Sequence, residues 1–361
     1  MSNFDLSALA LKAVCPNNEI LYDDKGMPSI MVKIPKMTYA QLGLGSNNSV
    51  HPAFIVNGTE VDAIYISKYQ NIVQNGRAYS LPGQDPRTSI NFDAALEACA
   101  AKGSGWHLMT RAEWAMLALW CKNNGTMPKG NNNYGKDHSE SNYVAIPSMD
   151  RDSSNRIQRV ATGTGPLSWS HDGTPSGIWD LNGNVNEWCG GMRTVYGELQ
   201  ILANNNAADS NNSQSASSTL WKAIKGSDGS LITPDGNGRT SGSVKLSWDG
   251  SKWTFTTNTP AADTTYHCCA LENVVCDSTI GDATKLLLQA LGLFKYDTTA
   301  GAYGGDIVYA NVVESERSLY CGGGWYGGAY AGVFCSILYD GRGIASGRIG
   351  FRSAFVKLPT A

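Results

Sequence analysis

The sequence lacks features that define several classes of protein. No stretch approaches the roughly 18 consecutive apolar residues of a membrane-spanning helix, and MSNFDLSALALKAV at the start is not a secretion signal, because it has no basic segment before a sustained apolar run. The formal charge is only -3, and no cluster of Lys and Arg stands out. We therefore expect a soluble protein that folds in a cytoplasm, without membrane or nucleic-acid partners.

Paired metal ligands are also missing. The cysteines are odd in number and contain no CxxC pair, which argues against a zinc site and against a disulfide framework. The nine cysteines are Cys15, Cys99, Cys121, Cys189, Cys268, Cys269, Cys276, Cys321 and Cys335. The histidines are scattered at His51, His107, His138, His171 and His267. We expect free thiols, no cofactor and no cluster of metal ligands.

Glycine and small polar residues dominate what is present. The chain has 40 glycines and 16% charged residues, a composition that favours short strands and long loops over helical bundles. Alternating patterns predict strands from Ile30 and over 63–72, in one sheet. Asp249 and Gly250 predict a hairpin turn, and 129–175 should be mostly loop.

Three helices are predicted among these strands. NFDAALEACAAKG (91–103) is amphipathic, and Thr110 with Glu113 forms a capping box that starts a second helix. A third helix is expected over about 282–291. Helices interspersed with strands predict an α+β protein.

The expected organisation is an arm or cap over 1–29, followed by one domain over 30–361. Residues 194–266 contain the polar run NNNAADSNNSQSASS and predict an insertion that leaves the core. The block 177–193 indicates a strand next to a tight turn, anchored by Trp188. Asp180 and Glu187 lie there without a histidine or a nucleophile at useful spacing, so we interpret them as structural.

Three motifs carry a resemblance. HLMTRAEWAMLA, GIWDLNGNVNEWC and GGGWYGGAYAGVF with the later RIGFRSA resemble, in this order, signature stretches of the formylglycine-generating-enzyme-like branch of the C-type lectin fold. With the leading strands they cover 30–193 and 267–358. The resemblance implies an α+β C-type lectin fold with long loops, and fold does not give activity.

The resemblance to the enzymes of this branch implies catalytic cysteines or clustered histidines, and this sequence lacks both patterns. The formylglycine-generating enzymes carry two cysteines shortly after the GG(S/N)W-like motif, but Tyr326–Gly332 contains none; Cys335 follows too late and Cys321 precedes the motif. The related sulfoxide synthases use clustered histidines. We therefore predict no enzyme and no catalytic residue. Calcium-lectin motifs are absent too, and only a structural calcium ion held by loop oxygens is left open.

The composition of the last block points elsewhere. Between Tyr320 and Arg348 there is no Lys, Glu, Gln, Met or Asn, and the only Trp is Trp325. The block resembles the variable region, here 320–352, of proteins diversified by retroelements. In that family AAY codons are randomised at their first two bases, which can give Gly, Tyr, Cys, Ile, Asp, Arg or Ser but not Lys, Glu, Gln, Met or Trp.

The resemblance implies a set of variable, ligand-binding positions within a fixed scaffold that includes Trp325, Val333, Phe334 and Phe351. The predicted variable positions are Gly324, Tyr326, Gly327, Tyr330, Cys335, Ile337, Tyr339, Asp340, Arg342, Gly343, Ser346 and Arg348. Tyrosine and arginine are the residues that dominate binding hot spots and antibody paratopes. The chemistry of the set is thus suited to binding.

The function that follows is presentation of a hypervariable surface to a protein or glycan receptor on a bacterium, as in a phage tail fibre that determines host tropism. The expected location is the phage virion after synthesis in the host cytoplasm, with the bacterial cytoplasm or cell surface as alternatives. Relatives imply a trimer or a monomer. The competing functions are a formylglycine-generating-type oxidase or related enzyme, and an invariant lectin-like structural or surface protein.

Overall fold

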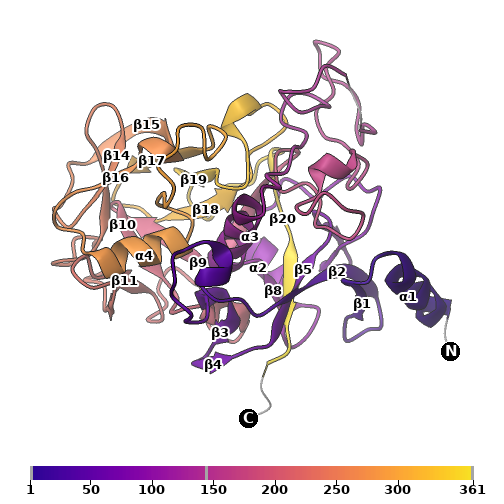
Figure 1. The fold of residues 1–361 in the computed structure, drawn as a ribbon, viewed down its shortest axis with the longest axis horizontal. Helices are drawn as coiled ribbons and strands as arrows, with labels where there is room; N and C mark the ends of the chain where they lie inside the picture. The colour runs from indigo at the N-terminus through magenta and orange to yellow at the C-terminus, as the bar shows by residue number, and fades with distance from the viewer. Residues whose placement is uncertain (1–2, 143–144, 359–361) are drawn as a thin grey trace.

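The computed structural model describes residues 3–142 and 145–358, which form two large sheets, two small hairpins, and helices between and beside the sheets (Figure 1). The smaller sheet is antiparallel and has five strands. In spatial order they are β1 (Asn18–Tyr22), β2 (Pro28–Pro35), β5 (Ala63–Ser67), β21 (Ser353–Val356) and β8 (Trp106–Leu108). The prediction that the strand near Ile30 and the strand that starts at 63 lie in one sheet is confirmed: they are β2 and β5, and they are direct neighbours.

The larger sheet has twelve strands. Its main path runs β15 (Asp263–Ala270), β17 (Ile307–Val312), β19 (Ser336–Leu338), β18 (Arg317–Cys321), β9 (Asn186–Val195), β10 (Glu198–Ile201), β13 (Lys245–Trp248), β14 (Trp253–Thr256) and β16 (Val275–Cys276). Off this path lie β11 (Lys222–Ile224), β12 (Leu231–Ile232) and β20 (Ile349–Phe351). Two small hairpins are separate: β3 (Ile55–Val56) with β4 (Thr59–Glu60), and β6 (Ile72–Gln74) with β7 (Arg77–Tyr79).

The helices include the three predicted within the domain. They are α1 (Asn3–Val14), α2 (Phe92–Ala100), α3 (Arg111–Asn123) and α4 (Asp282–Ala290). The capping box is confirmed: the Glu113 amide donates to the Thr110 hydroxyl, and the Glu113 carboxylate accepts from the Thr110 amide. Almost every side chain of α3 is buried, and Figure 1 places this helix near the centre of the molecule. No helix in the described part is long and apolar enough to cross a bilayer.

Short 3-10 turns complete the regular structure. They are η1 (Ala40–Leu42), η2 (Pro52–Phe54), η3 (Leu167–Trp169), η4 (Asn206–Ala208), η5 (Leu271–Asn273) and η6 (Gly328–Tyr330). Within 129–175 the described residues contain no longer element than η3, as the loop prediction requires. The fold is therefore α+β with long loops, as expected.

Two segments contribute more to the core than the sequence indicates. The predicted excursion over 194–266 holds β10 to β14 and the start of β15, all within the larger sheet, and Leu199, Trp253 and Phe255 are buried in the main core. In the predicted arm, β1 pairs with β2 along its full length. Long-range strand pairing, which local composition does not report, brings both segments into the fold.

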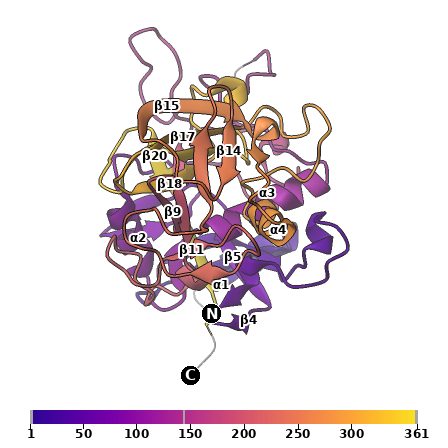
Figure 2. The same cartoon turned by 90° about the vertical axis from the view of Figure 1, so that its left-hand side faces the viewer.

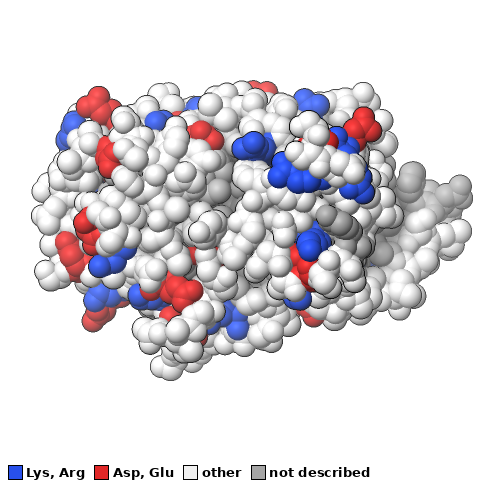
Figure 3. All heavy atoms as spheres, turned by 90° about the horizontal axis from the view of Figure 1, so that it is seen from above, with Lys and Arg blue, Asp and Glu red and all other residues white. Residues whose placement is uncertain are grey.

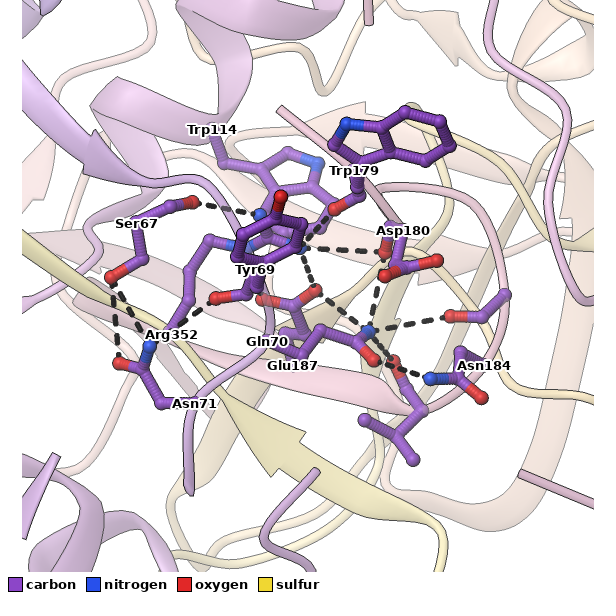
Figure 4. A network of polar contacts seen from close by, with 12 residues as sticks. Ser67, Tyr69, Gln70, Asn71, Trp114, Trp179, Asp180, Asn184, Glu187 and Arg352 are labelled. Carbon is purple, nitrogen blue, oxygen red and sulfur yellow. Dashed lines mark hydrogen bonds and ion pairs between the residues drawn. The ribbon is translucent and has the colours of Figure 1, made fainter. Parts of the chain in front are cut away.

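A buried polar network lies where the two sheets meet (Figure 4). Arg352, between β20 and β21, donates from Nε and Nη2 to the two carboxylate oxygens of Glu187 on β9, both at 2.6 Å. Gln70 donates to the same carboxylate and receives a hydrogen bond from Asn184. Glu187 thus has a structural partner, in line with the structural interpretation.

Candidate binding face

The segment 322–348 is held at both ends by one strand. On β9, Trp188 lies between Tyr320 of the antiparallel β18 and Phe351 of the parallel β20. Between these strands the chain forms the loop with η6, then β19, then a second loop. The segment therefore projects from a doubly anchored base at the upper edge of the molecule (Figure 1).

The expected scaffold positions of this segment are buried. Trp325, Val333, Phe334 and Phe351 all lie in the interior. The indole of Trp114 on α3 donates to the Val333 carbonyl at 2.7 Å. These contacts fasten the loops to the central helix, so the scaffold positions are confirmed as core.

The predicted variable positions differ in exposure. Tyr326 and Tyr330 are 40% and 62% exposed. Gly343 and Arg348 are also exposed, whereas five are half-buried: Gly327, Tyr339, Asp340, Arg342 and Ser346. Gly324, Cys335 and Ile337 are buried.

The three buried positions cannot contact a ligand in this conformation. Cys335 and Ile337 lie at β19, a central strand between β17 and β18, and pack in a hydrophobic cluster that includes Trp188. A Cβ on Gly324 would lie 2.9 Å from the ring of Tyr326, so this position is closed as well. The predicted ligand-binding role of these three positions does not agree with their burial.

Arg342 is occupied within the chain. Its guanidinium donates to both carboxylate oxygens of Glu316 at 2.5 and 2.7 Å, to Asp93 at 2.7 Å and to the Gln214 carbonyl at 2.9 Å. With these hydrogen bonds, Arg342 ties the second loop to α2 and to the residue that directly precedes β18. It acts here as a support for the face rather than as a free cation.

A tyrosine cluster, made of Tyr266, Tyr309, Tyr320 and Tyr339, forms the centre of the face. The ring of Tyr339 lies 4.8 Å from that of Tyr266 and 4.7 Å from that of Tyr309, centroid to centroid. Tyr266 is on β15 and 55% exposed, and Figure 2 shows β15 and β17 at the upper edge of the molecule. Besides burial, the nearby Tyr326 raises the pKa of both Tyr309 and Tyr339.

Sequence reasoning missed Tyr266 and Tyr309, because both precede the block whose composition drew attention. One signal was available for Tyr266: an aromatic residue next to the polar pair Thr264 and Thr265 in a strand-forming run. Tyr309 lies beside β19 because β17 and β19 pair in parallel, and no pattern in the sequence around Tyr309 indicates this pairing.

Comparison with known proteins assigns the chain to a family. Residues 48–229 match the model of the sulfatase-modifying factor enzyme 1-like domain, over just half of the chain. The chain belongs to this family. Its C-type lectin-type fold of the formylglycine-generating-enzyme-like branch is thereby confirmed. No curated protein matches the sequence.

Solved structures similar to this sulfatase-modifying-factor-like chain are distant. PvdO from Pseudomonas aeruginosa is 12% identical with a TM-score of 0.37, and covers 94% of this chain and 98% of its own. Treponema denticola variable protein 1 is 13% identical, with a TM-score of 0.35 and coverages of 94% and 99%. The Major Tropism Determinant U1 variant is 11% identical, with a TM-score of 0.33 and coverages of 94% and 71%. No function follows from likenesses with TM-scores below 0.5.

The thiols near the face of this family member are buried. Cys321 Sγ lies 3.1 Å from the Arg111 guanidinium; burial opposes its ionisation, but the Cys189 thiol and Arg111 lower the pKa of Cys321. Burial raises the pKa of Cys335. None of these three thiols is at the surface. In the described ranges no three His, Cys, Asp or Glu side chains are grouped to hold a metal ion.

Proposed function

We propose that this chain is a binding protein whose ligand contacts the binding face, defined here as Tyr266, Tyr309, Tyr326, Tyr330, Tyr339 and Arg348. The observation that carries the proposal is the convergence of Tyr266 on β15, Tyr309 on β17 and Tyr339 directly after β19, whose ring centroids lie within 6.3 Å of one another beside the edge strand of the larger sheet. Tyrosine offers a large amphipathic contact area at a small cost in side-chain entropy. Sites of this composition are typical of protein and glycan recognition.

We further propose that the exposed part of the segment 320–352 is diversified by a retroelement and is displayed by a phage tail fibre toward a protein or glycan receptor on a bacterial surface. Two features support this. The segment lacks Lys, Glu, Gln, Met and Asn up to Arg348, and its tips sit on a buried scaffold that tolerates exchange of exposed side chains. Several displayed copies would raise avidity.

Sequencing of the flanking locus in several isolates tests the diversification. A reverse transcriptase gene and a template repeat that matches 320–352 except at adenines are expected. Identical sequences in all isolates, with no such repeat, would leave an invariant lectin-like surface protein.

Loss of a tyrosine side chain should weaken binding without unfolding the protein. We expect Tyr326→Ala and Tyr339→Ala each to reduce adhesion of the labelled protein to cells of its bacterial host by about tenfold, since buried aromatic anchors contribute most of the energy of an interface. Glu60→Ala is the control, because Glu60 is exposed on β4 at the opposite end of the molecule (Figure 1). Unchanged adhesion by both tyrosine variants would contradict the proposal.

Binding should not depend on a divalent cation. We expect EDTA to leave both the melting temperature and host-cell adhesion unchanged, because no acidic cluster of three or more ligand residues occurs in residues 3–142 or 145–358. Thermal unfolding in EDTA and in millimolar calcium measures this. A higher melting temperature in calcium would instead reveal a site built from loop carbonyl oxygens.

Family membership favours one alternative, an oxidase of the formylglycine-generating type. Cys189, Cys321 and Cys335 would have to supply the thiols, and all are buried. Incubation of the protein with a cysteine-containing peptide, followed by mass spectrometry, separates the two functions. Conversion of the peptide cysteine to an aldehyde that Cys321→Ser abolishes would establish the enzyme.

A further inference from the structure

A hollow of about 410 Å³ opens beside the binding face. Its walls come from two distant segments: Tyr134, Arg156 and Arg159 from the long loop, and Tyr326 and Arg348 from the C-terminal block. Figure 3 looks down on this end of the molecule and shows basic side chains gathered right of centre. The volume is in the range of small-molecule sites.

Most charges around the hollow are already paired. Arg156 is bonded to Asp152 at 2.8 Å, and Arg159 is bonded to Asp85 through two nitrogens, at 2.9 and 2.8 Å. Arg348, by contrast, has no carboxylate partner among the ion pairs of the described residues and is exposed. It is the uncompensated cation of the hollow, in a protein whose net charge is negative.

Arg348 is also held in place. Its carbonyl accepts hydrogen bonds from the Asn186 amide at 3.0 Å and from the Asn186 side chain at 3.1 Å, which fixes the backbone at the end of the loop. Its guanidinium lies 4.6 Å from the ring centre of Tyr326, and Trp325 packs edge-on against the same ring at 5.6 Å. A guanidinium stacked on a ring still presents its N–H edge, which matches a carboxylate in a bidentate geometry.

The rest of the lining is polar. The hollow is also lined by Gln158, Ser346 and Gly347. The Tyr134 ring lies in the same wall, and the guanidinium of Arg156 is 4.0 Å from its centre. Amide and hydroxyl groups next to aromatic rings suit a ligand that has both hydroxyl groups and a flat apolar face. A sugar ring has both, whereas an acidic peptide offers few hydroxyls.

We propose that this hollow binds a saccharide that carries a carboxylate, with the carboxylate on Arg348 and a sugar ring against Tyr326. The inference rests on the proposed binding function and specifies the ligand class. Arg348 belongs to the predicted variable positions, whereas Tyr134, Arg156 and Arg159 lie outside the segment. The acid preference is thus set by Arg348, on a wall whose other residues lie largely outside the predicted variable positions.

The test compares trigalacturonate with its fully methyl-esterified form by isothermal titration calorimetry on the full chain. The acid is expected to bind at least tenfold more tightly, with an affinity that falls as salt rises. Arg348→Gln should remove the preference for the acid and leave the melting temperature unchanged. Arg239→Gln is the matched control, because Arg239 stacks on Tyr196 at 4.0 Å and is not part of the hollow.

Equal affinity for acid and ester would overturn the inference, and so would an acid preference that survives in Arg348→Gln. Tighter binding of a triglutamate peptide than of trigalacturonate would also reject the saccharide. If the tyrosine variants lose host adhesion while trigalacturonate fails to bind, only this inference fails. If adhesion is unaffected as well, the proposed function fails with it.

Discussion

Glu187→Gln is expected to lower the free energy of unfolding by about 3–5 kcal/mol, because it leaves the buried Arg352 guanidinium without a compensating charge. Both side chains are buried, and both carboxylate oxygens of Glu187 accept from Arg352. In the variant, the amide nitrogen would face an N–H donor of the guanidinium in either orientation of the amide group. Urea unfolding at pH 7 measures the loss.

Asp282→Asn is the control for this experiment. Asp282 is bonded to Lys285 at 2.9 Å on the surface of α4, where solvent screens the pair. We expect a change close to zero there. A loss below about 1 kcal/mol in Glu187→Gln would mean that the pair does not hold β9 to the junction of the two sheets.

Asp306→Asn is expected to stabilise the protein increasingly as the pH rises. Burial raises the pKa of Asp306 to about 7, although the Phe334 amide, which donates to it at 2.7 Å, acts in the opposite direction. Because the folded-state pKa lies above the ordinary value of 3.8, the folded protein keeps a proton that the unfolded chain releases. Wild-type stability therefore falls as the pH rises from about 4 to about 7 and then levels off.

Asparagine does not titrate, and its side-chain oxygen can still accept the hydrogen bond from Phe334. Relative to wild type, the variant should gain about 2–3 kcal/mol between pH 5 and pH 8. Urea unfolding of both proteins at pH 5, 6, 7 and 8 measures the difference. Asp180, with a pKa near 6, titrates in both proteins and cancels in the comparison. Parallel stability curves would show that Asp306 is ionised in the folded state.

Local signals predicted the helices well. The Thr110–Glu113 capping box starts α3 as expected, and α2 and α4 lie within a few residues of their predicted ranges. The turn at Asp249–Gly250 joins β13 to β14. These features depend on residues three or four positions apart, which a sequence displays directly.

Pairings between distant segments escaped prediction. The polar stretch in 194–266 indicates an excursion, yet β13 joins β10 and β14 runs parallel to β16 within the larger sheet. A strand joins a sheet through its backbone, so its side-chain composition says little about its partner.

The sequence predicted which segment carries the candidate site, but not which of its side chains are exposed. Amino-acid composition marked the segment that carries Tyr326, Tyr330 and Arg348, but composition carries no information on burial. Ile337 is covered because β19 is a central strand, and Arg342 is engaged because Asp93 and Glu316 meet it from other elements. Contacts with other parts of the fold therefore decide which of the predicted variable residues are exposed to solvent.

Because β18 and β20 are anchored to opposite sides of β9, the loops between them can vary in length. The two attachment points are two strand spacings apart, roughly 10 Å, and the core fixes this separation whatever lies between. Doubling the length of a loop whose ends are already held together costs only about 0.6 kcal/mol. The exposed stretch around Gly343 can therefore gain or lose residues as well as exchange them. In the proposed binding function, insertions there would let the same frame fit receptors of different depth.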